Sequence, residues 1–254
     1  KAATARQDSI ENVARKNAEN AAKLAAQQKI AQAQAAAKAD TTALFHSALK
    51  GKATNVVLKN SSVELTLNTK GGVVSKAVIK NFTDYNGNSN VTLFDSSSQS
   101  LNFALAAKEV NINTADLYFT PSNQTDSTVT MTATAGDGKE LVINYVLGSD
   151  YMLHAKLQTV GMANDFAPSA SQMDVQWKEM CRQQERGFTF ENRYASLTYH
   201  KVDGGTDYLS EAKSITDENI EKKIDWVAFK NQFFSAVMIA KNNFAENSLM
   251  TSVP

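Results

Sequence analysis

Apolar and polar residues alternate over short stretches in the middle of the chain. Residues 63–67 read VELTL and residues 128–134 read TVTMTAT. A period of two is the pattern of a β-strand with one buried face. Residues 141–147 (LVINYVL) and 152–160 (MLHAKLQTV) are rich in apolar strand formers. These stretches predict a series of strands between residues 56 and 160.

Residues that favour turns fill the gaps between these stretches. The clusters are Asn86-Gly87-Asn88, Gly136-Asp137-Gly138 and Gly148-Ser149-Asp150. Beyond residue 160 the pattern predicts strands at residues 173–177 and 197–200, a turn at 203–205, and a single helical turn at 216–223. Many short strands without helices between them are typical of an antiparallel β-sandwich, so the chain is expected to be mainly β.

One apolar stretch, residues 226–240 (WVAFKNQFFSAVMIA), fits two structures. Its large apolar residues at 226, 229, 233 and 237 have the spacing of a helical stripe. The same residue types favour strands, and Lys230-Asn231-Gln232 suits a turn between two of them. Periodicity leaves both structures open.

The composition changes near residue 40. Residues 1–39 are mostly Ala, Lys, Gln, Asn and Glu, which predicts a long α-helical arm of roughly 60 Å. The arm has no sustained heptad seam. Residues 40–55 are expected to be a linker with a short helical segment, and residues 56–254 to form the sandwich domain.

Charge and cysteine content narrow the classes of function. The 254 residues include 26 Lys and Arg against 26 Asp and Glu, so the net charge is zero, which argues against a nucleic-acid-binding role. Cys181 is the only cysteine, which excludes an intramolecular disulfide and a multi-cysteine metal site. No apolar run approaches the ~20 residues that span a bilayer. A chain that begins at Lys1 rather than Met is interpreted as a fragment.

Few residues suggest chemistry, and we predict no metal and no cofactor. The histidines, His46, His154 and His200, lack the spacing of metal ligands. Arg182 and Arg186 near Cys181 would favour a low thiol pKa, but without a histidine partner we interpret Cys181 as incidental.

The densest charged patch has two interpretations. Its members are Arg182, Glu185, Arg186, Glu191 and Arg193. They form either a solvated loop with weak ion pairs or a polar contact surface for a partner protein. A carbohydrate-binding or mutarotase-like enzyme is an alternative function, in which His154 or His200 would act with Glu185 or Glu191. A periplasmic binding lipoprotein domain is another.

The glycine pair Gly71-Gly72 follows the first alternating stretch. A phosphate-binding loop would need a helix after the glycines. Residues 73–79 (VVSKAVI) are rich in β-branched residues and predict a strand instead. The pair is therefore expected to take positive φ angles in a hairpin or a bulge.

Several short motifs occur in an order that resembles a known family. They are Thr69-Lys70-Gly71-Gly72, residues 81–85 (NFTDY), 91–94 (VTLF), 116–122 (DLYFTPS), 183–191 (QQERGFTFE) and 226–234 (WVAFKNQFF). Over residues 42–250 the chain resembles the large periplasmic domain of the YidC family of bacterial membrane protein insertases. The resemblance implies structural signature roles for Lys70, Gly71, Gly72, Trp226, Phe229, Gln232 and Phe233.

The resemblance implies a β-supersandwich related to mutarotase-like and sugar-binding domains, with residues 226–240 as strand, turn and strand. It implies one transmembrane helix before the domain and five after it, and a location on the periplasmic side of the inner membrane. Insertion belongs to the membrane part, so no catalytic residue is implied here. The implied partners are Sec translocase components (SecDF and SecYEG) and nascent membrane proteins. Family members continue through further strands and a helix, so truncation at Pro254 is expected.

Overall fold

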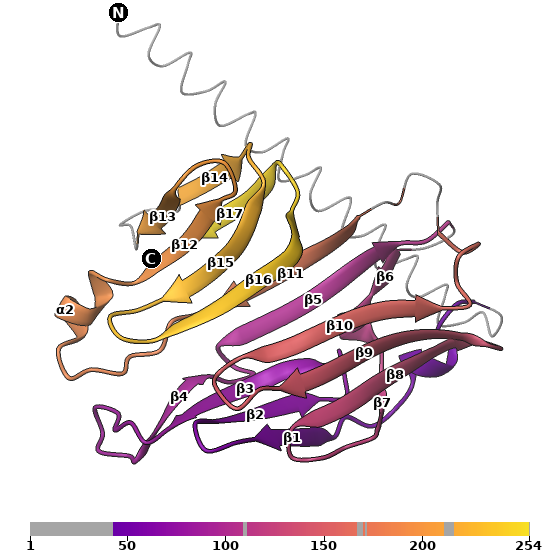
Figure 1. Ribbon diagram of the computed structural model, residues 1–254, viewed down its shortest axis with the longest axis horizontal. Helices are drawn as coiled ribbons and strands as arrows, with labels where there is room; N and C mark the ends of the chain where they lie inside the picture. The colour runs from indigo at the N-terminus through magenta and orange to yellow at the C-terminus, as the bar shows by residue number, and fades with distance from the viewer. Residues whose placement is uncertain (1–42, 109–110, 167–169, 171, 211–215, 254) are drawn as a thin grey trace, which may run out of the picture.

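Antiparallel β-sheets make up most of the computed structural model, which describes residues 43–108, 111–166, 170, 172–210 and 216–253 (Figure 1). The expected helical arm, residues 1–39, lies outside the described residues. Among those described, no helix is both long enough and apolar enough to cross a membrane. The mainly β prediction is confirmed.

Two four-stranded sheets share the first and larger core. One contains β1 (Asn55–Lys59), β2 (Val63–Asn68), β3 (Val73–Lys80) and β4 (Asn90–Phe94) in chain order. The other has the order β10-β9-β8-β7, from β7 (Thr120–Ser122), β8 (Thr128–Gly136), β9 (Lys139–Leu147) and β10 (Leu153–Val160). Leu65 and Leu67 from the first sheet and Met131 and Ile143 from the second lie in one buried cluster. The alternating stretches therefore form the inner faces of a sandwich.

The segment before β1 packs on this core. Phe45 is 2% exposed, and its backbone N–H donates to the carbonyl of Ala135 on β8 at 3.1 Å. The short helical segment expected here is a single 3₁₀ turn, η1 (Ser47–Leu49), whose Ala48 is buried.

A third sheet extends the sandwich toward the second half of the chain. It has the order β11-β5-β6, from β5 (Gln99–Ala106), β6 (Asn111–Asn113) and β11 (Met173–Glu179), and the turn η2 (Thr114–Asp116) follows β6. β11 pairs with β5 from Gln99 to Leu105, although the paired residues are 68 to 80 positions apart in sequence. Through this long-range pairing, β11 connects the first part of the chain to the second.

The last part of the chain builds a second, smaller core. Its sheets have the orders β13-β12-β15-β16 and β14-β17. The strands are β12 (Ser196–Lys201), β13 (Thr206–Ser210), β14 (Thr216–Ile220), β15 (Ile224–Lys230), β16 (Ser235–Phe244) and β17 (Ser248–Ser252). Leu197, Tyr199 and Ile224 lie in this core, and Trp177 of β11 packs edge-on against Phe229 of β15 at 4.6 Å.

The sequence was ambiguous or misleading at two places in this second part. Residues 226–240 are strand, turn and strand, as the family resemblance implied, because β15 and β16 pair as a hairpin. The helical turn predicted at residues 216–223 is wrong, since β14 pairs with β17 from Thr216 to Ile220. Local polarity suggested a turn, but sheet pairing with β17 and burial of Ile220 favour the strand.

The glycine pair turns the chain between β2 and β3. Gly71 and Gly72 have φ of 87° and 67°, and the ladder between these strands shifts register at Thr66 and Leu67. The expected hairpin with positive φ is confirmed. The hydroxyl of Tyr145 donates to the carbonyl of Gly72 at 2.8 Å within the core, which fixes this corner against the second sheet.

Candidate functional site

The charged patch lies in the connector, which we define as residues 180–195 between β11 and β12. The connector contains one short helix, α2 (Phe188–Asn192). Arg186 and Arg193 are exposed, but Glu191 is only 4% exposed, as is its neighbour Gln184. The interpretation as a fully solvated loop is therefore wrong for Glu191. The structure gives its carboxylate an internal role.

The Glu191 carboxylate accepts hydrogen bonds from its own connector. The backbone N–H of Gln184 donates to Oε1 at 2.9 Å and to Oε2 at 3.1 Å, and the N–H of Glu185 donates to Oε2 at 3.1 Å. α2 makes this possible because it turns the chain back toward residues 184 and 185. A buried carboxylate needs such donors to offset its lost hydration.

Asn231 joins the connector to the tip of the β15–β16 hairpin. Its side-chain amide donates to Glu191 Oε1 at 3.0 Å and to the carbonyl of Arg182 at 3.2 Å. Its side-chain oxygen accepts from the N–H of Phe234 at 3.0 Å, within the hairpin turn. One buried asparagine therefore holds two segments that are 40 residues apart.

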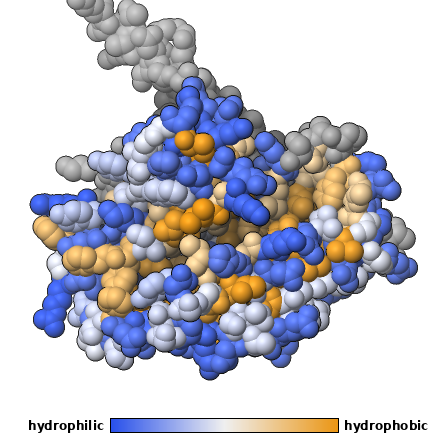
Figure 2. All heavy atoms as spheres, in the orientation of Figure 1, coloured by the Kyte–Doolittle hydropathy of each residue, from blue (hydrophilic) through white to orange (hydrophobic). Residues whose placement is uncertain are grey.

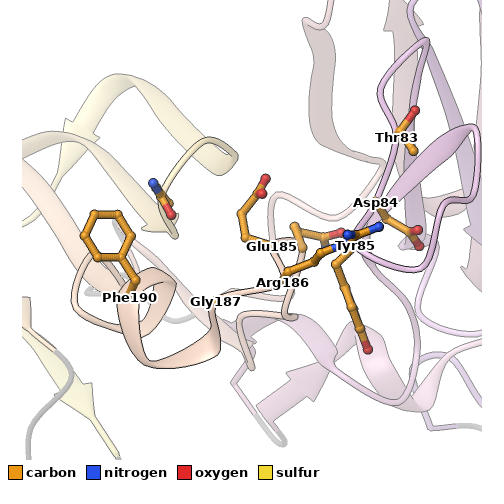
Figure 3. Close-up of a pocket in the computed structure, with 9 residues that line it drawn as sticks. Thr83, Asp84, Tyr85, Glu185, Arg186, Gly187 and Phe190 are labelled. Carbon is orange, nitrogen blue, oxygen red and sulfur yellow. The ribbon is translucent and has the colours of Figure 1, made fainter.

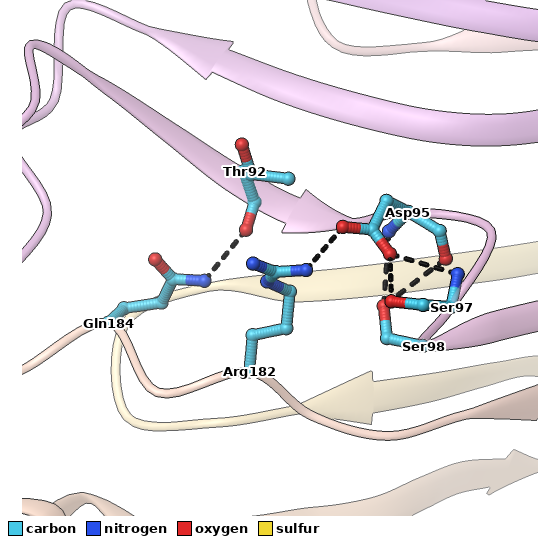
Figure 4. A network of polar contacts seen from close by, with 6 residues as sticks. All are labelled: Thr92, Asp95, Ser97, Ser98, Arg182 and Gln184. Atoms are coloured by element: carbon cyan, nitrogen blue, oxygen red, sulfur yellow. Dashed lines mark hydrogen bonds and ion pairs between the residues drawn. The ribbon is translucent and has the colours of Figure 1, made fainter.

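The other side of the connector is bonded to the first sandwich (Figure 4). Gln184 donates from Nε2 to the carbonyl of Thr92 on β4 at 2.8 Å, and Arg182 forms an ion pair with Asp95. Hydrogen bonds from the hydroxyl and N–H of Ser97 lower the pKa of Asp95, and the positive charge of Arg182 adds to this. The connector is thus fastened to both cores.

A cavity of about 350 Å³ opens beside the connector (Figure 3). Its lining comes from the β3–β4 loop, the connector and the β15–β16 turn: Thr83, Asp84, Tyr85, Gln184, Glu185, Arg186, Gly187, Phe190 and Gln232. Arg186 points toward the β3–β4 loop in this view, and Phe190 lies on the opposite side. The cavity brings together Glu185 and Arg186 of the predicted patch, whereas Glu191 is buried and is not among the lining residues.

Exposed aromatic side chains come from the same three segments; we call this set the aromatic rim. Its members are Phe82, Tyr85, Phe188, Phe190, Tyr194 and Phe233. Phe82 packs edge-on against Phe234 at 5.6 Å, and Phe190 against Tyr194 at 5.4 Å. Exposed aromatic residues next to a charged cavity are typical of protein contact surfaces.

The thiol of Cys181 is not activated. Burial raises the pKa of Cys181 to about 11, and the nearby carboxylates of Glu179 and Glu191 add to this. The effect expected from the neighbouring arginines is therefore absent, because Arg182 is directed to Asp95 instead. A thiol with a raised pKa is a poor nucleophile, which agrees with an incidental cysteine.

Glu179 gives the domain a pH-dependent stability. Burial raises the pKa of Glu179 from 4.5 to about 8, and its Oε2 is buried without a hydrogen-bond partner among the described residues. The folded state therefore keeps a proton that the unfolded state releases between pH 4.5 and 8. Stability conferred by the neutral carboxyl is present below pH 4.5 and is lost as the pH rises toward 8.

We expect Glu179→Gln to remove this loss. In urea titrations the variant should gain about 1–2 kcal/mol over wild type at pH 8.5 and little or nothing at pH 4.5. Glu64→Gln on β2 is the control, because it also removes one carboxylate from a strand. Equal effects of Glu179→Gln at both pH values would contradict the assignment.

The three histidines do not converge on the cavity. His200 bonds through Nδ1 to Asp225 Oδ1 at 2.9 Å and stacks on Trp226, while His154 is exposed on β10. His46 precedes η1 and lies 3.4 Å from the Lys50 amine. The cavity lining includes Glu185 but no histidine, and Glu191 is occupied by internal donors. The carbohydrate-active alternative gains no support.

The signature residues lie in both halves of the domain. Lys70 lies 5.6 Å from the ring centroid of Tyr118, next to the Gly71–Gly72 corner. Phe229 packs in the second core, Gln232 lines the cavity, and Phe233 belongs to the aromatic rim. Sequence reasoning missed Asn231 and Gln184 as network members, since their types and spacing carry no signal beyond a turn and a polar run.

Comparisons with known proteins agree with this architecture. Residues 55–253, from the first residue of β1 to just beyond β17, match the family described as the YidC periplasmic domain. The chain is 43% identical over 252 residues to "Membrane protein insertase YidC" of Phocaeicola vulgatus, covering 98% of the chain and 39% of that protein. It is 38% identical over 216 residues to the protein of the same name from Bacteroides fragilis strain ATCC 25285, covering 85% and 35%.

A third relative, from Parabacteroides distasonis, bears the same name and is 35% identical over 209 residues, which is 81% of the chain and 33% of that protein. The chain thus spans between a third and two fifths of the length of these relatives. The chain belongs to the YidC family and carries its periplasmic domain.

Proposed function

We propose that the chain is a non-catalytic accessory and interaction domain of a YidC-type insertase, which helps to insert, fold and assemble inner-membrane proteins, alone or with the Sec translocase. The domain would lie on the periplasmic side of the inner membrane. The full-length protein would be held there as a multi-pass membrane protein. Family membership over residues 55–253 is the observation that supports this proposal most directly.

The contact surface in this proposal is the aromatic rim with Arg186 and Glu185 of the cavity. The Glu191 network holds the connector and the β15–β16 turn in fixed positions, so the rim is preorganised for binding. Arg182 and Glu191 then have structural roles, and the exposed Arg186 and Arg193 contribute charge at the surface. Sec translocase components, SecDF in particular, are the proposed partners.

The proposed architecture is a β-supersandwich at residues 56–254, preceded by a linker at 40–55 and a helical arm at 1–39. The third sheet packs on the first core, and its Trp177 contacts Phe229 of the second core, which supports the extended sandwich. The arm would lead from the membrane to the sandwich.

The test is substitution of the rim in the full-length insertase. Replacing Phe188, Phe190 and Phe233 by Ser should lower the SecDF recovered with the purified insertase by about fivefold or more, because exposed aromatic residues dominate contact energies. The matched control replaces three exposed apolar residues of another surface, Tyr151, Met152 and Val160, by Ser. Unchanged SecDF recovery with the rim variant would contradict the proposed contact.

A further inference from the structure

The sheet β13-β12-β15-β16 has apolar residues on both faces. Its inner face packs on the second core through Leu197, Tyr199 and Phe229. The alternate residues face the other way, and among them Val237 and Ile239 of β16 are 52% and 57% exposed. The outer face of a sandwich sheet is normally polar. Exposed apolar residues on this face therefore indicate a binding surface.

The described residues leave one edge of the β16 backbone unpaired. Within the described residues β16 pairs with β15 alone. At the hairpin turn the N–H of Asn231 donates to the carbonyl of Phe234 at 3.0 Å, so these two residues form a hydrogen-bonded pair. Along the ladder, non-hydrogen-bonded and hydrogen-bonded pairs then alternate. By this alternation the N–H and C=O groups of Ser235, Val237 and Ile239 point away from β15. Exposed apolar side chains and open backbone groups thus occur on the same residues.

Positive charge flanks this edge. Lys230, opposite Ser235, and Lys241, two residues beyond Ile239, are both exposed, and neither forms an ion pair with a described residue. Residues 235 and 241 are at most roughly 20 Å apart at the rise of a strand, because the ladder with β15 shifts register beyond Ile239. In the space-filling view hydrophobic residues lie over β16 and around a hollow beside it, in the middle of this face (Figure 2).

We propose that the open edge of β16 binds an extended polypeptide segment as an added β-strand. The segment would carry alternating apolar side chains that meet Val237 and Ile239, with a carboxylate near each end that meets Lys230 and Lys241. An unfolded segment of a client protein with this sequence pattern is the proposed occupant. The proposal goes beyond the Sec contact and uses a different surface, so either can fail without the other.

A second copy of this chain fits the edge less well. Two antiparallel β16 strands centred on Met238 would place Lys241 of one copy opposite Ser235 of the other, in the row that contains Lys230. Like charges brought into one row oppose pairing. The charge pattern therefore favours an acidic-flanked peptide over self-association.

The test is peptide binding to the 254-residue chain by fluorescence anisotropy. The probe is a fluorescein-labelled peptide of alternating Val and Thr with an Asp at each end. The double variant Val237→Lys, Ile239→Lys should weaken binding by about tenfold or more, because an edge lysine blocks strand addition. The matched control Val146→Lys, Val160→Lys changes two valines that are 48% and 43% exposed on β9 and β10, and should bind like wild type.

Two further arms test the mode of binding. A probe N-methylated on alternate residues cannot pair along one edge and should lose at least about tenfold in affinity, and a probe with Lys ends should also bind more weakly. Circular dichroism and thermal unfolding must show that the variants stay folded. Equal binding of the edge variant or of the N-methylated probe overturns the proposal. The proposal is also overturned if wild type sediments as a dimer, the edge variant sediments as a monomer, and the probe does not dissociate the wild-type dimer.

Discussion

Glu191→Ala is expected to lower the free energy of unfolding by about 3–5 kcal/mol. The substitution leaves the backbone N–H groups of Gln184 and Glu185 and one amide hydrogen of Asn231 without their acceptor, and Gln184 and Asn231 are only 4% and 5% exposed. Each unsatisfied buried donor costs about 1–3 kcal/mol. Urea denaturation at pH 7 measures the loss.

Glu185→Ala is the matched control, since it removes a neighbouring carboxylate that makes no such buried contacts, and it should cost under about 0.5 kcal/mol. Glu191→Gln keeps one acceptor oxygen and should fall between the two. If Glu191→Ala loses less than about 1 kcal/mol of stability, the network is not needed for folding.

Gly72→Ala is expected to destabilise the domain by about 3 kcal/mol. Gly72 has φ of 67°, which is unfavourable for a residue with a side chain, and an added Cβ would lie 2.9 Å from the ring of Phe119. Relieving that contact also disturbs the bond from the Tyr145 hydroxyl to the Gly72 carbonyl. The change in melting temperature, followed by circular dichroism, measures the effect.

Gly138→Ala separates the two causes. Gly138 has nearly the same backbone angle, φ of 69°, but nothing lies within 4 Å of an added Cβ. Its substitution should cost only about 1 kcal/mol, the price of the backbone angle alone. If both variants lose the same stability, contact with Phe119 contributes nothing at the corner.

Much of the first sandwich could be predicted because its strands follow a local rule. The residues at 63–67 and 129–133 alternate strictly, and each buried position of β2 and β8 has the expected apolar residue. The glycine corner was equally readable, since a β-branched strand follows it. Such features depend only on residues that are close together in the chain, so they can be recognised in a single sequence.

The connector and β14 could not be predicted for the opposite reason. Glu191 bonds to Asn231, and Gln184 to Thr92 on β4, across 40 and 92 residues. β14 is polar and becomes a strand only because β17 lies beside it. The residue types alone do not indicate which of these distant residues will pair. The patch was found as a set of charges, but its division into a buried carboxylate and exposed arginines required the fold.

The Glu191 network also determines how the two cores would separate under tension. Hydrogen bonds weaken steeply over a fraction of an ångström, whereas apolar contacts such as Trp177 with Phe229 fade gradually as surfaces slide. A connection made of a few buried hydrogen bonds therefore resists small displacements but breaks after a short extension. It would hold the cores at a fixed angle against small pulls, and above a threshold force it would release in one step and leave the β11–β5 sheet as a hinge.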